Sequence, residues 1–361
     1  MNLVFHVSGH GFGHAVRSAE VMRAILSRAP AARIHVRTTA PAWLFPSDDR
    51  VRVSEAALDV GVVQAHSLTL DPEATLRAMG TILDRADALL AGEEAFVRAA
   101  RARAVVGDIP PLAFEAARRA GVPGIAVANF SWDWIYRAYL PAEPRFAPLI
   151  DAMSSAYAAA TLLLRLPFHG DLAVFPVIRD IPLIARRAAR GRDALRRALG
   201  IGEGPVALLS FGGFGLAPLP VAAIARAHPG WTFLVPWVPR ETGPANLRIL
   251  DGERARHEEL VAAADVVVTK PGYGIVAECL ANGARVLYTS RGDFPEYPIL
   301  EAALLRHAHA RYVAPEDLLA GRIGDALSAL LDASDSIETL PPPAFAGARA
   351  AADAILALAG A

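Results

Sequence analysis

Short apolar runs alternate with longer helix-like stretches along the whole of the 361-residue chain. The runs are rich in Val, Leu and Ile, and each is followed by a turn that carries Gly or Pro and then by a helical pattern, the longest from about Pro72 to Arg103. The pattern predicts strands at Leu3–Val7, Arg33–Thr38, Ala104–Gly107, Gly124–Ala128, Val206–Ser210, Thr232–Val235, Val266–Thr269 and Arg285–Tyr288. Strands that alternate with helices in this way favour parallel sheets of the α/β class.

Two interruptions divide this pattern into parts. Pro176–Gly200 begins with prolines and continues as an arginine-rich amphipathic stretch, which is typical of a linker that leads into a second domain. Glu338–Pro343 separates a final alanine-rich helix, Ala344–Gly360, from that domain. We therefore predict two similar α/β domains that face each other, residues 1–175 and residues 176–343, followed by a separate helix within residues 344–361.

Composition excludes several classes of protein. The chain is 53% hydrophobic with a formal net charge of −1, so it has no basic surface that would suggest nucleic acid or an anionic membrane as a partner. No apolar run reaches the roughly 18–20 residues of a membrane span. The single cysteine, Cys279, cannot form an internal disulfide and no signal peptide opens the chain, so we expect a reducing, cytoplasmic location.

The loop after the first predicted strand has an unusual content of Gly and His. It reads SGHGFGHAVRS over Ser8–Ser18 and leads into a predicted helix. Such a loop exposes backbone N–H groups to an anion, and Gly11 and Gly13 permit positive φ and close approach of a ligand. The dinucleotide fingerprint is absent, because His14 stands where its third glycine would be and no acidic residue ends the second strand. A P-loop is absent as well, so we expect neither a nicotinamide enzyme nor a P-loop NTPase.

His14 is the first candidate catalytic residue. It would lie in the first helical turn, where the positive end of the helix dipole favours the neutral imidazole that a general base needs. The alternative is that His10 and His14 only hydrogen-bond the loop together. Arg17, one turn further on, is either a phosphate or loop anchor or a solvated helix arginine. Asp108, at the end of another predicted strand, is a second candidate acid or base.

Two loops in the second half resemble the opening loop in design. SFGGFG follows the strand Val206–Ser210, and TKPGYGIVAE follows Val266–Thr269. In the second loop Pro271 and Gly272 would form the turn and Gly274 would open a helix, whose N-terminus could hold a diphosphate. Lys270, the only lysine of the chain, could add a point charge for phosphate. These loops supply the candidate diphosphate-binding residues Gly212, Gly213, Lys270, Gly272, Tyr273 and Gly274.

Three carboxylates in the same half are candidates for binding hydroxyl groups. Glu278 would lie on the first turns of the helix opened by Gly274, where it could accept hydrogen bonds from a ribose diol; otherwise it is an ordinary surface carboxylate. Asp293 and Glu296 follow the strand Arg285–Tyr288, where they could contact sugar hydroxyls or be solvated loop acids.

An aromatic segment, ANFSWDWIYRAY, follows the strand Gly124–Ala128. Because open α/β sheets bind ligands at the carboxyl ends of their strands, we predict a partly exposed aromatic platform that receives an acceptor. The alternative, packing in the core or an interface, is preferred for Trp134 and Ile135. The candidate acceptor-binding residues are His10, Gly11, Gly13, Asn129, Trp132 and Asp133.

Several of these motifs together resemble a known family. SGHGFGH, LDVGVVQAHSLTLD, VANFSWDWIY, RLPF, DIPLIARR and KPGYGIVAE are similar to the amino-terminal glycosyltransferase-like region of plant arabinokinases, from Val4 to about Leu300. The chain lacks the Gly-rich phosphate loop of a sugar kinase, so we do not expect kinase activity. More distantly it resembles the GT-B superfamily, especially the bacterial transferase that forms lipid II, which implies that His14 matches the histidine of its glycine loop and Glu278 its ribose-binding glutamate.

The resemblance implies a GT-B fold of two Rossmann-like domains that face each other across a cleft, an acceptor domain first and a nucleotide-sugar domain second. It also implies that residues 344–361 pack back on the first domain. It also implies an inverting glycosyltransferase whose co-substrate is a nucleotide-sugar, UDP-linked by resemblance alone, with no metal ion or other cofactor, since no Asp-x-Asp motif is present. The acceptor, a small molecule or a lipid-linked group, is not identified. The run GHAVRS also resembles the Gly-His-x-x-Arg of nucleotide-sugar hydrolases in the pseudaminic acid pathway, where the histidine activates water. Hydrolysis and non-catalytic nucleotide-sugar binding are therefore the alternatives.

Overall fold

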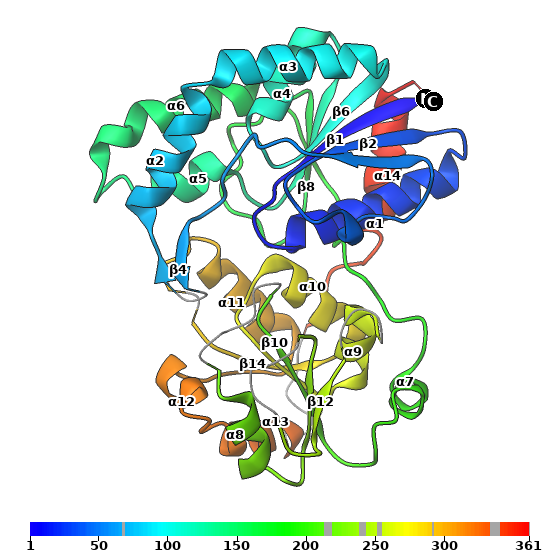
Figure 1. Cartoon of the computed structure of the whole chain (residues 1–361), viewed down its shortest axis with the longest axis vertical. Helices are drawn as coiled ribbons and strands as arrows, with labels where there is room; N and C mark the ends of the chain where they lie inside the picture. The colour runs from blue at the N-terminus through cyan, green and yellow to red at the C-terminus, as the bar shows by residue number, and fades with distance from the viewer. Residues whose placement is uncertain are drawn as a thin grey trace.

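Two α/β domains, each built on a parallel sheet, lie against each other in the computed structural model (Figure 1). The structure describes residues 1–66, 69–212, 219–237, 243–250, 255–290, 292–332 and 340–360. No helix within these ranges combines the length and the apolar character that a membrane crossing requires.

The first sheet grows outward from its first strand in both directions. Its strand order is β3 (Val51–Ser54), β2 (Arg33–Arg37), β1 (Asn2–Val7), β6 (Ala102–Asp108), β7 (Gly124–Ala128), β8 (Leu162–Arg165) and β9 (Ile178–Asp180), all parallel. The strand order therefore reverses between β1 and β6, where Val7 lies opposite Asp108. In open α/β sheets a reversal of this kind leaves a crevice at the carboxyl ends of the two strands, and ligands bind there.

The second sheet repeats this arrangement. Its order is β12 (Leu247–Ile249), β11 (Thr232–Val235), β10 (Val206–Ser210), β13 (Val266–Thr269), β14 (Arg285–Tyr288) and β15 (Ala310–Tyr312), again parallel. The reversal falls between β10 and β13, with Ser210 opposite Thr269. The two crevices face each other across the domain interface.

Helices cover both sheets. Those of the first domain are α1 (Gly13–Arg28), α2 (Pro72–Leu83), α3 (Ala86–Ala99), α4 (Leu112–Ala120), α5 (Trp132–Arg137) and α6 (Ala147–Ala158). Those of the second are α7 (Arg192–Ala198), α8 (Val221–Ala227), α9 (His257–Ala263), α10 (Tyr273–Asn282), α11 (Tyr297–His307), α12 (Pro315–Leu319) and α13 (Gly324–Asp332). Short 3-10 turns lie at Ala42–Leu44 and Pro144–Phe146, and a small antiparallel hairpin joins β4 (Gln64–His66) to β5 (Thr69–Leu70).

The last helix, α14 (Gly347–Leu358), returns to the first domain. It packs beside α1 (Figure 1), and Arg28 of α1 forms an ion pair with Asp353 of α14. The backbone N–H of Gly347 donates to the Leu183 carbonyl oxygen, and a Cβ at Gly347 would overlap the Pro182 carbonyl, so only glycine permits this approach. The predicted pair of parallel-sheet α/β domains is confirmed, and so is the return of the C-terminal helix to the first domain.

The sequence located the central strands better than the edges. Gly124–Ala128, Val206–Ser210, Thr232–Val235, Val266–Thr269 and Arg285–Tyr288 have the predicted bounds, whereas β3, β8, β9, β12 and β15 were not predicted. The long helix predicted to Arg103 breaks after Leu83 and again after Ala99, and its last residues belong to β6. The first sheet also continues past the predicted boundary at residue 176, since β9 is its last strand.

Candidate active site

The glycine loops of the two domains meet at the interface. The first loop follows β1 and ends where α1 begins at Gly13; Gly11 within it has φ +67°. The second follows β13 and ends where α10 begins at Tyr273, with Gly272 as its N-cap. A Cβ built on Gly274 would lie 3.6 Å from the Gly13 Cα, so the first turns of α1 and α10 approach each other closely.

His14, in the first turn of α1, is bound to the carboxylate at the end of β6. His14 Nδ1 lies 2.8 Å from Asp108 Oδ1. Arg17 binds the same carboxylate through two hydrogen bonds, in a bidentate arrangement: its Nε donates to Oδ2 at 2.7 Å and its Nη2 to Oδ1 at 2.6 Å. The Ser18 hydroxyl donates to Oδ2 at 3.0 Å. Three side chains of α1 therefore converge on one carboxylate across the β1–β6 crevice, and all four residues are buried.

These partners decide the charge of Asp108. Burial by itself would raise the pKa of Asp108, but the Arg17 cation and the hydrogen bonds from Arg17 and His14 hold it at about 2. The carboxylate therefore stays ionised near neutral pH. This geometry suits Asp108 to orienting His14 and does not suit it to accepting a proton as a general base.

The same arginine connects this cluster to the second domain. Arg17 Nη1 donates to Asn129 Oδ1 at 2.7 Å, and Asn129 Nδ2 donates across the interface to Glu296 Oε1 at 2.6 Å. The Arg17 guanidinium also lies over the ring of Tyr273, 5.3 Å from its centroid. Asn129 and Glu296, predicted on opposite sides of the cleft, thus bind each other in this structure.

The predicted exposed aromatic platform is wrong. Phe130, Trp132 and Tyr136 are buried, because the segment packs into the core of the first domain. Trp132 still borders the site. Its ring packs edge-on against the His10 ring, with the two ring centroids 5.4 Å apart, and its Nε1 donates to Asp59 Oδ2 at 2.8 Å.

Two carboxylates next to this segment have different surroundings. Asp59 lies beside the site, and its pKa is raised by burial against the opposing hydrogen bonds from Ser8 and Trp132. Asp133 accepts a hydrogen bond from Ser154 of α6 at 2.8 Å, so its carboxylate packs against that helix. Sequence analysis missed Asp59, whose chain segment was noted only as part of a family motif.

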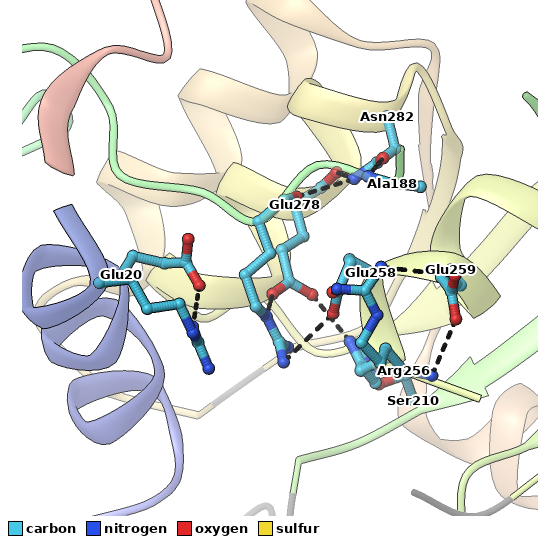
Figure 2. Close-up of polar contacts among 11 residues, drawn as sticks. Glu20, Ala188, Ser210, Arg256, Glu258, Glu259, Glu278 and Asn282 are labelled. Carbon is cyan, nitrogen blue, oxygen red and sulfur yellow. Dashed lines mark hydrogen bonds and ion pairs between the residues drawn. The ribbon is translucent and has the colours of Figure 1, made fainter. Parts of the chain in front are cut away.

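Glu278 on α10 is buried and not a surface carboxylate. Its Oε1 accepts from Arg186 Nε at 2.5 Å, and its Oε2 lies 2.7 Å from His257 Nδ1. His257 Nε2 lies 2.9 Å from Ser210 Oγ, at the end of β10. Figure 2 shows this chain of contacts from Glu278 to Ser210, with Glu258, 3.4 Å from Arg186, beside it.

This network makes Glu278 an anion with partners already in place. Burial would raise the pKa of Glu278, but the neighbouring His257 and Arg186 lower it below the ordinary value. A ribose hydroxyl that approached Glu278 would meet His257 and Arg186 beside it. Neither residue was predicted from the sequence: Arg186 comes from the linker, and His257 lies in a stretch with no glycine or strand signal.

The other predicted donor residues take varied positions. Gly212 has φ +80° at the end of β10, Lys270 is half-buried after β13, and Asp293 is exposed. Gly213 lies outside the described residues. Within the described ranges, no group of three or more His, Cys, Asp or Glu side chains is arranged to hold a metal ion.

Comparisons with known proteins agree with this architecture. No protein-family model matches the chain. It is 33% identical over 328 residues to L-arabinokinase of Arabidopsis thaliana, a match that covers 88% of this chain but only 31% of the relative. The chain thus spans about a third of the length of the curated relative that it matches.

Solved glycosyltransferases share the fold over nearly their whole length. Phytolacca americana UGT2, complexed with UDP-2-fluoro-glucose and pterostilbene, is 14% identical with a TM-score of 0.61, over 98% of this chain and 93% of that one. The glycosyltransferase VinC, in complex with dTDP, is 18% identical with a TM-score of 0.58, over 100% and 96%. The relation to the lipid II transferase stays a prediction. The chain is therefore related in sequence to part of L-arabinokinase and has the GT-B fold of glycosyltransferases.

Proposed function

We propose that this protein is an inverting, metal-independent glycosyltransferase that moves a sugar from a nucleotide-sugar to a hydroxyl group of an acceptor. The observation that carries the proposal is the position of the His14–Asp108 pair, which faces the N-terminus of α10 across the domain interface. One side offers a candidate base and the other a place for a diphosphate, within the fold that the solved glycosyltransferases share.

His14 would act as the general base. Because Asp108 is ionised, the Nδ1–H of His14 donates to it, which leaves the Nε2 lone pair to accept the proton of an acceptor hydroxyl. The acceptor oxygen then attacks the anomeric carbon from the side opposite the leaving diphosphate, and the configuration inverts. Asp108 keeps its charge and stabilises the imidazolium that forms.

The second domain would hold the donor. Backbone N–H groups from Gly272 to Gly274, together with Lys270, would stabilise the negative charge that develops on the leaving diphosphate. Gly212 would line the same diphosphate site after β10. Glu278 would accept from the ribose beside His257.

The remaining predicted residues would contact the donor sugar and the acceptor. Asp293 and Glu296 would bind hydroxyls of the donor sugar. His10, Gly11, Gly13, Asn129 and Trp132 would border the acceptor; Asp133 is left out because its carboxylate packs against α6. UDP is proposed as the carrier by resemblance, and dTDP is the competing choice.

A panel of nucleotide-sugars in a thermal-shift assay tests the proposal. A donor at about 100 times its dissociation constant stabilises the folded protein by about 2.7 kcal/mol. No shift with any UDP- or dTDP-sugar would refute donor binding. With the donor found, His14→Ala should keep donor affinity and lose turnover by orders of magnitude, whereas His35→Gln on β2, remote from the site, should leave both unchanged.

A turnover assay with the donor found in the panel separates the alternatives. Rapid release of free sugar without any acceptor would make the protein a nucleotide-sugar hydrolase, with water in the place of the acceptor. Donor binding without turnover, unchanged in His14→Ala, would make it a non-catalytic nucleotide-sugar-binding protein.

A further inference from the structure

The Arg17 side chain contacts several polar side chains at the domain interface. Its guanidinium donates to Asp108 twice and to Asn129 once, and its Nη2 lies 3.2 Å from His14 Nδ1. The side chain is 5% exposed. A cation so deeply buried persists only where its partners fix it in one position.

Two of the contacts that fix Arg17 depend on the second domain. The Tyr273 ring, which covers the guanidinium, belongs to α10. Asn129, which receives Nη1, is itself held by Glu296 at the start of α11. Removing the second domain from this position would expose the guanidinium to water and release the Asn129 amide.

His14 is largely shielded from solvent in the arrangement seen here. Its side chain is 8% exposed, and the first turns of α1 and α10 approach each other closely beside it. An acceptor must therefore enter while the domains are apart, when Tyr273 and Glu296 are withdrawn from Arg17.

We propose that Arg17 is a positioning residue that makes the orientation of His14 depend on contact between the two domains. When the domains separate, the guanidinium loses its aromatic cover and its fixed Asn129 partner, and its hold on Asp108 loosens. The His14–Asp108 hydrogen bond then weakens. On closure over a bound donor the network re-forms and the imidazole is fixed again.

This inference rests on the proposed function for its purpose, because a base that is oriented only in the closed state does not activate water toward an exposed donor. The physical coupling itself needs no substrate and is measured on the unliganded protein. The readout is the rate at which the His14 Nδ1 proton exchanges with water, followed by NMR of protein labelled with ¹⁵N-histidine and assigned by its loss in His14→Gln.

Tyr273→Leu is the main test, since the Tyr273 ring lies over the Arg17 guanidinium, and Arg17 in turn contacts His14. We expect exchange of the His14 proton to quicken about tenfold, within the range that a cation–π contact contributes. Glu296→Ala, which frees Asn129, should have the same direction of effect and serves if Tyr273→Leu does not fold. Arg28→Lys, on the same helix but in an exposed ion pair, is the matched control and should exchange as wild type. Wild-type exchange in a folded Tyr273→Leu or Glu296→Ala protein overturns the proposal.

A kinetic arm uses the donor identified by the thermal-shift panel. Arg17→Lys keeps the positive charge but cannot form both hydrogen bonds to Asp108. We therefore expect turnover to fall at least tenfold, while the donor dissociation constant stays within about twofold of the wild-type value. Loss of donor affinity in step with turnover would mean a structural role and would overturn the proposal. If no donor binds the wild-type protein, the proposed function fails, but the exchange experiment still decides whether Arg17 couples the domains to His14.

Discussion

The ion pair between Arg17 and Asp108 should be one of the most strongly coupled pairs in the protein. Replacing Asp108 with Asn leaves the Arg17 cation buried, and replacing Arg17 with Met leaves the carboxylate with only His14 and Ser18. Breaking one partner of a buried pair costs about 3–5 kcal/mol. Each single substitution already removes the ion pair. The double variant Arg17→Met/Asp108→Asn should therefore lower the free energy of unfolding by less than the sum of the two single variants.

The size of the coupling follows from the state of Asp108. A pKa held at about 2, against an ordinary 3.8, corresponds to about 2 kcal/mol in favour of the ionised carboxylate. Burial opposes this shift and His14 shares in it, so we expect an Arg17–Asp108 coupling free energy of the same order, about 2–3 kcal/mol. The folded pKa is depressed, so this contribution is present above the ordinary carboxyl pKa and is lost as pH falls through about 2. At pH 4 the coupling should be nearly undiminished.

Wild type, the two single variants and the double variant form a double-mutant cycle, and their urea unfolding measures the coupling. Tryptophan fluorescence is the signal because Trp132 lies beside the site. The slopes against urea must agree among the variants for the comparison to hold. The matched control is the cycle of Arg28→Met and Asp353→Asn, an exposed pair for which we expect at most about 1 kcal/mol. Additivity of the Arg17 and Asp108 costs to within about 0.5 kcal/mol would refute the reasoning.

Three further predictions concern other parts of the chain. Gly61→Ala should lower the thermal midpoint by an amount equivalent to about 1–3 kcal/mol, since Gly61 has φ +65° and a Cβ there would overlap the His10 ring; an unchanged midpoint would contradict this. Cys279 is buried and its pKa is raised by burial, so iodoacetamide at pH 8 should modify it in urea but not in the native protein, as mass spectrometry would show. Burial alone would raise the pKa of Glu93, but hydrogen bonds from His6 and Arg37 hold it at about 2. The ionised Glu93 therefore stabilises the fold above the ordinary carboxyl pKa, and this stabilisation is lost as pH falls toward 2. The unfolding free energy of Glu93→Gln should change less between pH 5 and pH 2 than that of wild type, and an equal change in both proteins would refute this.

Local patterns were sufficient for the central strands and for the glycine loops. A buried parallel strand is a continuous apolar run, and a turn into a helix N-terminus requires glycine at particular positions, so both leave a signal within a few residues. The edge strands β9, β12 and β15 are short; β12 and β15 are partly exposed and β9 is exposed throughout. Their apolar content does not distinguish them from loops.

The aromatic segment shows where local patterns fail. Composition indicated rings near a strand end but not whether other parts of the chain cover them. The cover comes from distant residues: Asp59 binds the Trp132 indole from 73 positions away, and the Tyr157 hydroxyl accepts from the Trp132 backbone N–H. Burial of a ring is a property of the packed domain.

The sequence by itself determined that the chain has two α/β domains, that His14 lies in the first turn of the first helix, and that a second glycine loop leads into α10. Only the tertiary structure decided which groups share a hydrogen bond: Asp108 meets Arg17 across 91 positions, and Asn129 meets Glu296 across 167 and across two domains. The physical reason is that secondary structure follows from neighbours along the chain, whereas the charge, orientation and exposure of a side chain follow from whatever the fold packs against it.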